Sequence, residues 1–279
     1  MSGVRLAGLL LAVQLLAGCA AQAEPPAATG ASPVTAKPAS ATPDAGRSTA
    51  SPDIGPTASP SAGTTAPSPE RPAMVNKEEQ MKANEQLIAA AERGDTAEVN
   101  RLLSAGADID SKDGRGRTAV MAATHGNKPA VVQALIAAGA NIHLQDNKQD
   151  NPFLYAGAEG LLDILKLTID AGADVKLTNR YNGTALIPAS EHGYVDIVRE
   201  LLTRTAIDVN HVNRLGWTAL MEAIVLGGGG TNHQTVVRLL LEHGADPNIP
   251  DKEGVTALAH AESRGFKEIA RMLRDAGAH

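Results

Sequence analysis

The stretch from Thr118 to Asn141 reads TAVMAATHGNKPAVVQALIAAGAN, and related stretches recur along most of the chain. It contains two apolar segments, at 119–123 and 131–136, separated by a polar break around Asn127. Apolar residues within each segment recur at the three- and four-residue spacing of one helix face. The stretch therefore predicts two short helices joined by a turn.

A polar residue opens each copy of this unit, and the six openers are separated by 33, 33, 33, 34 and 38 residues. The openers are Glu85, Thr118, Asn151, Thr184, Thr218 and Thr256. A Gly-Ala pair closes five copies, beginning at Gly106, Gly139, Gly172, Gly244 and Gly277. A fixed period of this length is typical of a solenoid, in which repeated units stack on one another.

The recurring residues have physical roles inside each unit. The five openers from Thr118 onward have side chains that can cap a helix N-terminus. Apolar pairs such as Leu135-Ile136 and Leu201-Leu202 form a ridge on the second helix, which one unit cannot bury alone, so that stacking must cover it. Small residues let neighbouring helices approach closely, at Ala90, Ala123, Ala156, Ala189, Ala223 and Ala261.

These residues resemble the ankyrin repeat, and the resemblance covers residues 84–279. It implies an all-α ankyrin-repeat solenoid of about six repeats, made of helix-turn-helix units joined by β-hairpin-like loops. Residues 74–83 form a lead-in to this domain. The approximate units are 84–113, 114–146, 147–179, 180–213, 214–251 and 252–279.

Some copies depart from the pattern. Asn127 and Asn182 replace glycines, which is conservative because asparagine tolerates left-handed backbone best after glycine. The third unit has Gln149 at such a glycine position, and it opens with Asn151 in place of threonine, so we expect it to be the least stable unit. The fifth unit carries five extra residues around Gly227–Gly230. This insertion is either a binding loop or a neutral change of length, since insertions in repeat proteins map to loops.

The N-terminus has the composition of an export signal. Arg5 precedes a run of 12 mostly apolar residues ending at Ala17, which at about 1.5 Å per residue is too short for a bilayer core of about 30 Å. The sequence Leu16-Ala17-Gly18-Cys19 resembles the lipobox of bacterial lipoproteins. That resemblance implies a signal peptide at 1–18 and lipidation of Cys19 with diacylglycerol and a further acyl chain such as palmitate, which exceeds the two chains that stable anchoring requires. The alternative is an ordinary secretory signal that contains a cysteine.

Residues 19–73 resemble a spacer in their composition. Eleven of the 16 prolines lie before residue 73, among alanine, serine and threonine. Ser-Pro, Thr-Pro and Ala-Pro steps favour extended backbone and oppose helix formation. We therefore expect a lipidated Cys19 followed by a disordered tether.

Charge and residue spacing disfavour several functional classes. The net charge is −6, and the chain has no Lys/Arg cluster, so nucleic acid is a poor candidate partner. The histidines fall at unequal positions within their units and lack zinc-ligand spacing. Gly227–Gly230 lacks the Gly-Lys-Ser/Thr ending of a phosphate loop. We therefore expect no catalysis, cofactor, metal or small-molecule substrate.

The ankyrin resemblance implies that a partner lies in a concave groove formed by the hairpin tips and the first helices. We single out Trp217, because it precedes Thr218 at a position expected to point into the groove. An exposed tryptophan near Arg180 and Tyr181 has the composition of an interaction hot spot. The alternative is that Trp217 packs over its own hairpin. The candidate groove residues are Arg115, Arg117, His125, Lys148, Asp150, Arg180, Tyr181, Glu191, His192, Arg214, Trp217, Lys252 and Arg264.

These features predict a protein-protein interaction module of the bacterial cell envelope, anchored to the membrane through Cys19. The expected location is the periplasm-facing outer membrane in a Gram-negative host and the outer face of the cell membrane otherwise. Two alternatives remain open at this stage. One is an inhibitor or immunity-type protein that occludes an envelope-acting enzyme, and the other is a structural spacer between envelope layers.

Overall fold

A computed structural model of the chain describes residues 77–279. The predicted signal peptide, Cys19 and the tether lie outside the described residues. Within the described part, twelve helices follow one another. They are α2 (Lys77–Arg93), α3 (Thr96–Ser104), α4 (Ala119–His125), α5 (Pro129–Ala137), α6 (Pro152–Ala158), α7 (Leu162–Asp170), α8 (Leu186–Glu191), α9 (Val195–Arg204), α10 (Ala219–Val225), α11 (Thr231–Glu242), α12 (Ala257–Ser263) and α13 (Lys267–Asp275).

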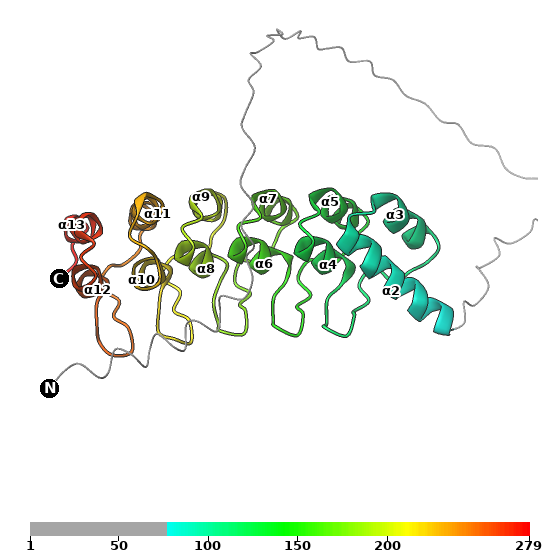
Figure 1. Ribbon diagram of the computed structural model, residues 1–279, viewed down its shortest axis with the longest axis horizontal. Coiled ribbons are helices and arrows are strands. Elements are labelled where there is room, and N and C mark those ends of the chain that lie inside the picture. Colours follow the sequence, from blue (N-terminus) through cyan, green and yellow to red (C-terminus); the bar gives the residue numbers. More distant parts are fainter. Residues whose placement is uncertain (1–76) are drawn as a thin grey trace, which may run out of the picture. The chain divides into compact units, whose positions relative to one another are not determined.

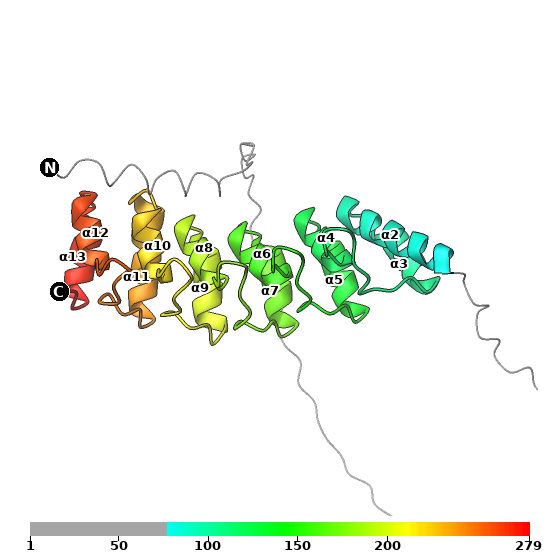
Figure 2. The ribbon, with the colours of Figure 1, turned by 90° about the horizontal axis from the view of Figure 1, so that it is seen from below.

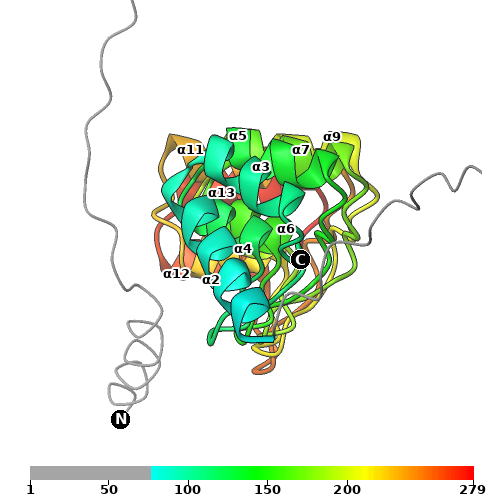
Figure 3. The ribbon, with the colours of Figure 1, turned by 90° about the vertical axis from the view of Figure 1, so that its right-hand side faces the viewer.

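The helices of residues 77–279 form two rows (Figure 1). The inner row contains α2, α4, α6, α8, α10 and α12, and the outer row contains α3, α5, α7, α9, α11 and α13. Each helix packs against the next helix of its own row and against the other helix of its own unit, and the repetition of these pairs is visible in Figure 2. The loops that join successive units all project to the same side, below the inner row (Figure 3). Residues 77–279 contain no strand, so the predicted all-α solenoid of helix-turn-helix units is confirmed.

Most inner helices begin at the predicted polar cap. The side-chain oxygens of Thr118, Asn151, Thr218 and Thr256 accept hydrogen bonds from the backbone N–H three residues later, at 3.4, 2.8, 3.2 and 3.4 Å. Each bond satisfies one of the amide groups that the first turn of a helix leaves without a partner. The cap prediction is therefore confirmed in these four units.

Thr184 does not cap its helix, so the prediction is wrong in the fourth unit. α8 begins at Leu186, its N-cap position is Ala185, and the buried Thr184 hydroxyl has no hydrogen-bond partner among the described residues. Pro188 explains the difference, because it has no N–H to donate to the Thr184 carbonyl four residues earlier. The Ile187 N–H donates to that carbonyl instead, at 3.3 Å, which gives a tighter three-residue turn at this end.

The first unit has a longer inner helix than the repeat pattern predicts. α2 begins at Lys77, so Glu85 lies inside this helix instead of opening it, and the expected boundary at residue 84 falls within α2. Leu87 and Ile88 are buried against the second unit, whereas most residues before them are exposed or half-buried. α2 thus covers the apolar end of the stack, as a terminal repeat must.

Three non-glycine residues have left-handed backbone. The φ angles of Asn127, Gln149 and Asn182 are +48°, +62° and +58°, which confirms that they occupy the positions of the missing glycines. In the fifth unit Gly227, which follows the first helix, does not have this left-handed backbone. Gly229 has the positive φ, of +69°, and the following residues 231–233 extend α11.

The predicted close approach of neighbouring inner helices is confirmed. All six recurring alanines from Ala90 to Ala261 are fully buried. Gly157 is also buried in this layer, and a Cβ atom there would lie 2.8 Å from the Ala185 Cβ, which is too close for a normal contact. The first residue of each apolar pair on the outer row is buried, for example Leu102, Leu135 and Leu201. These contacts form one continuous core along the stack.

The loops between units contain a repeated five-residue turn, which we call a finger. In each finger the first residue donates its N–H to the carbonyl of the fifth, at 2.8–3.0 Å, and its side-chain Oδ1 accepts from the N–H groups of the third and fifth residues. This Asx arrangement fixes the turn without a strand. The fingers are residues 113–117, 146–150, 179–183, 213–217 and 251–255.

A second set of aspartates stabilises the turn between each outer helix and its finger. Asp108, Asp174, Asp208 and Asp246 accept hydrogen bonds from the backbone N–H two residues later, at 2.9–3.1 Å. These recurring aspartates therefore serve turn hydrogen bonding, and this role commits their side chains to the fold.

Candidate protein-binding face

The surface of interest is the one that carries the fingers and the adjoining side of the inner helices, which we call the inner face. Its finger tips are the second and third residues of each finger. Every tip carries one exposed cation, and the five cations are Arg115, Lys148, Arg180, Arg214 and Lys252. Within residues 77–279 none of them forms an ion pair. These five residues lie on the surface that the ankyrin resemblance predicts to be a binding groove, and their role in binding stays a prediction.

Trp217 is not an exposed groove residue. Its side chain is only 7% exposed and belongs to the core, and the backbone N–H of Trp217 donates to Asn213 Oδ1 at 3.1 Å. The fifth residue of a finger lies where the finger joins the inner helix, so a large side chain there packs onto the stack. The exposed apolar residue of this finger is Leu215, which is 42% exposed. The alternative stated for Trp217, packing over its own hairpin, agrees better with this burial.

Arg117 occupies the same finger position and is also buried, with 5% exposure. Its guanidinium donates to Asp113 Oδ2 at 2.9 Å and to Glu92 Oε1 at 2.8 Å, so that it connects the second unit to α2. Arg117 holds the pKa of Glu92 below its usual range, chiefly through this hydrogen bond. The expectation that Arg117 is a free groove residue is therefore wrong, because both of its hydrogen-bonded carboxylates belong to the stack.

The Arg264 side chain is exposed, but it forms hydrogen bonds with the preceding unit. Its guanidinium donates to the carbonyls of Val225 at 2.9 Å and Gly227 at 3.0 Å, and its carbon lies 4.9 Å from the ring centre of Phe266. It thereby satisfies carbonyl groups at the C-terminal end of α10. A Cβ atom on Gly229 would lie 2.5 Å from the Phe266 ring. The glycine-rich insertion is thus packed against the sixth unit, which favours a structural role for it.

His125, Glu191 and His192, which are candidate groove residues, lie at the C-terminal ends of the inner helices α4 and α8. His125 is half-buried, and its ring centre lies 4.0 Å from that of Tyr155. His192 is exposed, 5.3 Å from the ring of Tyr194. Burial raises the pKa of the Glu191 carboxyl above its usual range. These groups are brought to one side of the stack by the repeat, but the described residues show no hydrogen-bonded network that joins them.

Asp150 is a half-buried acid at the base of the second finger, residues 146–150. Burial, reinforced by the nearby Asp146 charge, raises the pKa of Asp150 to about 6, although Arg180 and Lys148 act in the opposite direction. Neither cation is close enough to form an ion pair with it. The inner face therefore combines exposed cations at the tips with partly buried acids behind them.

Glu222 is the acid that the sequence did not single out. It is 5% exposed on α10, and its Oε1 accepts a hydrogen bond from Asn213 Nδ2 at 2.7 Å. Burial, together with the Glu191 charge, raises the pKa of Glu222 to about 8. The sixth unit has the equivalent pair, in which His260 Nε2 lies 2.7 Å from Asp251 Oδ2. A signal existed in the sequence, since Glu222 stands at a helix position that holds Ala122 in the second unit.

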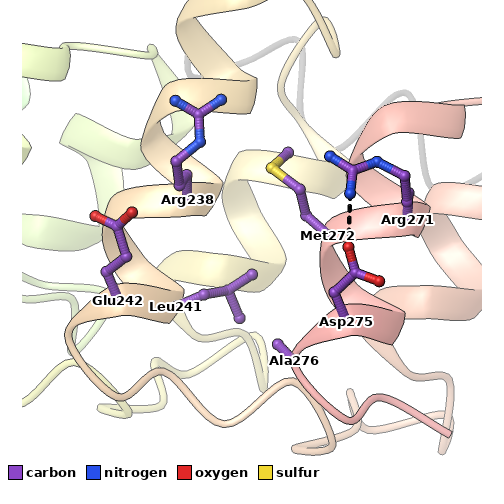
Figure 4. A pocket seen from close by; sticks show the side chains of 7 residues that line it. All are labelled: Arg238, Leu241, Glu242, Arg271, Met272, Asp275 and Ala276. Atoms are coloured by element: carbon purple, nitrogen blue, oxygen red, sulfur yellow. Dashed lines mark hydrogen bonds and ion pairs between the residues drawn. The ribbon is translucent and has the colours of Figure 1, made fainter.

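The clearest cavities lie away from the finger tips. One, of about 320 Å³, lies between α11 and α13 of the outer row, with Leu241 and Met272 facing each other across it (Figure 4). Its rim carries the ion pair of Arg271 with Asp275, at 2.6 Å. The other, of about 350 Å³, is lined by residues that include Tyr194 and Asn232. Both are shallow crevices between successive units.

Residues 77–279 contain neither a cluster of metal-ligating side chains nor a helix that could span a membrane. No three His, Cys, Asp or Glu side chains in that range lie close enough together to hold a metal ion. In the same range, no helix has the length and apolar character that crossing a membrane requires. Repeat stacks use extended surfaces for binding, and the inner face is a surface of this kind.

A family model for ankyrin repeats in three copies matches residues 87–179 and 153–251, and a second model for ankyrin repeats matches residues 230–274. The chain belongs to the ankyrin repeat family. Ankyrin domains are in general non-catalytic scaffolds that bind other proteins.

Individual relatives agree with this assignment. A putative ankyrin repeat protein of Escherichia coli is 57% identical over 81 residues, which cover 29% of this chain and 40% of that protein. The matches span less than half the length of the first curated relatives. The crystal structure of an ankyrin repeat domain from Acinetobacter baumannii is 51% identical, with a TM-score of 0.67, over 69% of this chain and 98% of that chain.

A more distant structure is a complex. A chain in the solved structure of a predatory endopeptidase from Bdellovibrio bacteriovorus in complex with an immunity protein is 26% identical to this chain. The TM-score is 0.57, over 68% of this chain and 97% of that chain.

Proposed function

We propose that this chain is a protein-binding module that holds its partner against the inner face and is attached to a bacterial envelope membrane through Cys19. The observation that carries the first part is the set of five exposed finger-tip cations, none of which forms an ion pair within residues 77–279. Because every finger presents its tip on the same side of the stack, one partner can contact several tips at once. Exposed, unpaired charges in such an arrangement favour specificity and rapid association with a complementary surface.

The proposed attachment rests on the sequence Leu16-Ala17-Gly18-Cys19 and on the proline-rich segment that follows it. A tether of residues 20–73 that behaves as a flexible coil spans about 40 Å, from about 5–6 Å times the square root of its length. This distance would let the ankyrin domain reach partners near the membrane surface without being fixed to it.

Site-specific photo-crosslinking in the native cell tests the binding face. A photoreactive amino acid replaces Leu215 at a finger tip, and the matched control replaces the exposed Arg199 on the outer helix α9. We expect a discrete protein adduct with the Leu215 variant and none with the Arg199 variant. Adducts of the same protein from both positions, or from Arg199 alone, would contradict the assignment to the inner face.

Membrane fractionation tests the attachment separately. We expect Cys19→Ala to move the protein from the membrane fraction to the soluble fraction, because the substitution removes the only cysteine that can be acylated. Unchanged fractionation of Cys19→Ala would contradict lipidation while leaving the binding face intact.

An immunity-type inhibitor is a second candidate function. It is favoured by the likeness of this chain to a chain in the complex of an endopeptidase with an immunity protein. An inhibitor would cover the active site of an envelope enzyme, whereas a scaffold would leave its partner active. Activity of the crosslinked partner distinguishes them: a fall that returns when the complex dissociates supports inhibition, and unchanged activity supports a scaffold.

A further inference from the structure

Two neighbouring fingers differ from the other three in composition. Residues 179–183 read NRYNG and residues 213–217 read NRLGW, and neither contains an acidic residue. The other three fingers all begin with aspartate. The two fingers also share an order, with arginine in second place and a large tyrosine or leucine in third place. The fourth and fifth units therefore present the same pair of groups, a cation and an apolar side chain, side by side.

The backbone connects the two tips directly. The N–H of Arg214 donates to the carbonyl of Tyr181 at 2.9 Å. The guanidinium of Arg180 lies 4.5 Å from the ring centre of Tyr181, so that this arginine is held over its own neighbour. The carbonyl of Arg214 accepts a hydrogen bond from Lys252 Nζ, which joins the next finger as well. The two tips are thus held in a fixed relation to each other before any partner binds.

Exposed apolar surface is concentrated at the same place. Leu215 is 42% exposed and the nearby Val212 is 40% exposed, and Met81 on α2 is the other large exposed hydrophobic residue within 77–279. Isolated apolar side chains are common on protein surfaces, but two of them beside a tyrosine and two arginines have the composition of an interaction hot spot. We call Arg180, Tyr181, Val212, Arg214 and Leu215 the paired-finger patch.

The charge of the patch is not neutralised by the protein itself. Arg180 and Arg214 form no ion pair within residues 77–279, whereas several cations of the outer row do. For example, Arg204 lies 2.6 Å from Asp170, and Arg271 lies 2.6 Å from Glu268. These outer-row cations are paired within the stack, whereas the patch leaves two guanidinium groups for a ligand. Guanidinium groups bind carboxylates through paired hydrogen bonds.

We propose that the paired-finger patch binds a segment of the partner protein in which carboxylates flank an apolar side chain. This inference rests on the proposed function and adds the chemistry of the partner. Neighbouring helices pack about 8–10 Å apart, so adjacent finger tips have a similar spacing. An extended polyproline-type segment rises about 3.1 Å per residue with three residues per turn. Carboxylates at every third residue of such a segment would face both arginines, with the apolar residues between them against Leu215 and Tyr181.

Defined peptides test the proposal with the full chain. The probe is a fluorescent peptide of repeated Glu-Leu-Pro triplets, and binding is measured by fluorescence anisotropy. One control peptide replaces each Glu with Lys, and a second replaces each Leu with Ser. We expect the Glu-Leu-Pro peptide to bind at least about tenfold more tightly than the lysine peptide and several-fold more tightly than the serine peptide. We also expect its binding to weaken as salt rises toward 0.15 M, where the Debye length is about 8 Å.

Charge reversal at the patch has a matched control on the outer row. We expect Arg180→Glu combined with Arg214→Glu to weaken Glu-Leu-Pro binding by about tenfold or more, since each exposed pair alone is worth about two- to fivefold. Arg199→Glu combined with Arg238→Glu makes the same change in charge on α9 and α11, at exposed arginines without ion pairs. The outer-row double variant should bind as the natural chain does. Because all four side chains are exposed, circular dichroism should show unchanged folding in both variants.

Three results would overturn the proposal. They are equal binding of the glutamate and lysine peptides, no saturable binding of the glutamate peptide at low salt, and equal loss in the patch and outer-row variants. Patch-dependent binding of phosphatidylglycerol vesicles or of an oligonucleotide in preference to the peptide would also overturn it, because it would assign the patch to a different class of ligand. If any of these results accompanied a discrete adduct at Leu215 in the crosslinking experiment, the proposed function would stand and this inference alone would fail.

Discussion

The fingers share one backbone conformation, but the side chains at their tips and at their bases have different roles. The base of a finger is its fifth residue, where the finger joins the inner helix. At the base, Arg117 and Trp217 occupy equivalent positions and are 5% and 7% exposed. At the tip, two residues earlier in each finger, Arg115 and Leu215 are exposed. The base residues contribute to the stack, through an ion pair in one unit and apolar packing in the other. Stability and binding are therefore assigned to side chains only two residues apart, and substitutions can separate them.

Trp217→Ala is expected to have the largest effect on stability. Truncation of a nearly buried tryptophan removes apolar contacts and leaves a cavity, at a cost of about 3–5 kcal/mol. Leu215→Ala is the matched control, and it should change the free energy of unfolding by less than about 1 kcal/mol, because Leu215 is 42% exposed. Chemical denaturation of both variants measures the difference. Similar losses in the two variants would contradict the division between base and tip.

Glu222 should make the stability of the fifth unit depend on pH. Burial and the Glu191 charge raise the pKa of Glu222 from 4.5 to about 8 in the folded chain. The folded state therefore binds this proton more tightly than the unfolded state does, and the stabilisation present below about pH 4.5 is lost as the pH rises through about 8. The loss begins above about pH 4.5 and is on the order of 3 kcal/mol by pH 7.

Glu222→Gln tests this pH dependence, since glutamine keeps an oxygen for Asn213 Nδ2 but does not ionise. Between pH 5 and pH 9 the variant should lose less unfolding free energy than the natural chain. Glu242→Gln, at an exposed position on α11, is the control and should keep the natural pH dependence. Identical pH profiles for Glu222→Gln and the natural chain would mean that Glu222 is charged in the folded state at neutral pH.

Arg117→Met should destabilise the junction between the first two units by about 1–3 kcal/mol. The substitution removes hydrogen bonds to Asp113 and Glu92 from a buried position, and charged hydrogen bonds are worth about that much. Arg115→Met changes the exposed arginine of the same finger and should be neutral within about 0.5 kcal/mol. Thermal unfolding of the pair provides the measurement. A neutral Arg117→Met would show that this ion pair does not stabilise the junction.

The smallest expected effect on stability belongs to the paired-finger patch. Arg180→Glu with Arg214→Glu should leave the free energy of unfolding within about 0.5 kcal/mol of the natural value, because neither side chain forms an ion pair within residues 77–279. The same double variant should lose partner affinity. A loss of stability as large as that of Trp217→Ala would show that the tips, like the bases, belong to the stack.

The sequence predicts the repeated elements of this fold well, because each recurring residue has a local cause. The caps at Thr118 and Thr218 and the left-handed Asn127 depend only on neighbouring backbone, and the structure confirms them. The cap prediction is wrong at Thr184 for an equally local reason, because Pro188 has no N–H to donate. This proline is visible in the sequence. The residues that determine helix ends and turns can therefore be recognised from the sequence, including the proline that explains the exception at Thr184.

The side chains of the inner face were harder to predict, because their environment depends on contacts between units. The position of Trp217 before the helix cap predicts a side chain in the groove, yet the finger turns this side chain onto the core. Arg117 is buried because α2 brings Glu92 to it from 25 residues away. Glu222 becomes notable only when the stack buries it next to Asn213. Burial at a finger base is set by the neighbouring unit, which a single repeat does not reveal.

Hydrogen–deuterium exchange of the full chain, with and without the partner identified by crosslinking, tests the central claim most directly. The account predicts slower exchange on binding at the fingers 179–183 and 213–217 and in the inner helices α8 and α10. It predicts unchanged exchange in the outer helices α7, α9 and α11. Protection confined to those outer helices, with the two fingers unaffected, would contradict the claim that the inner face holds the partner.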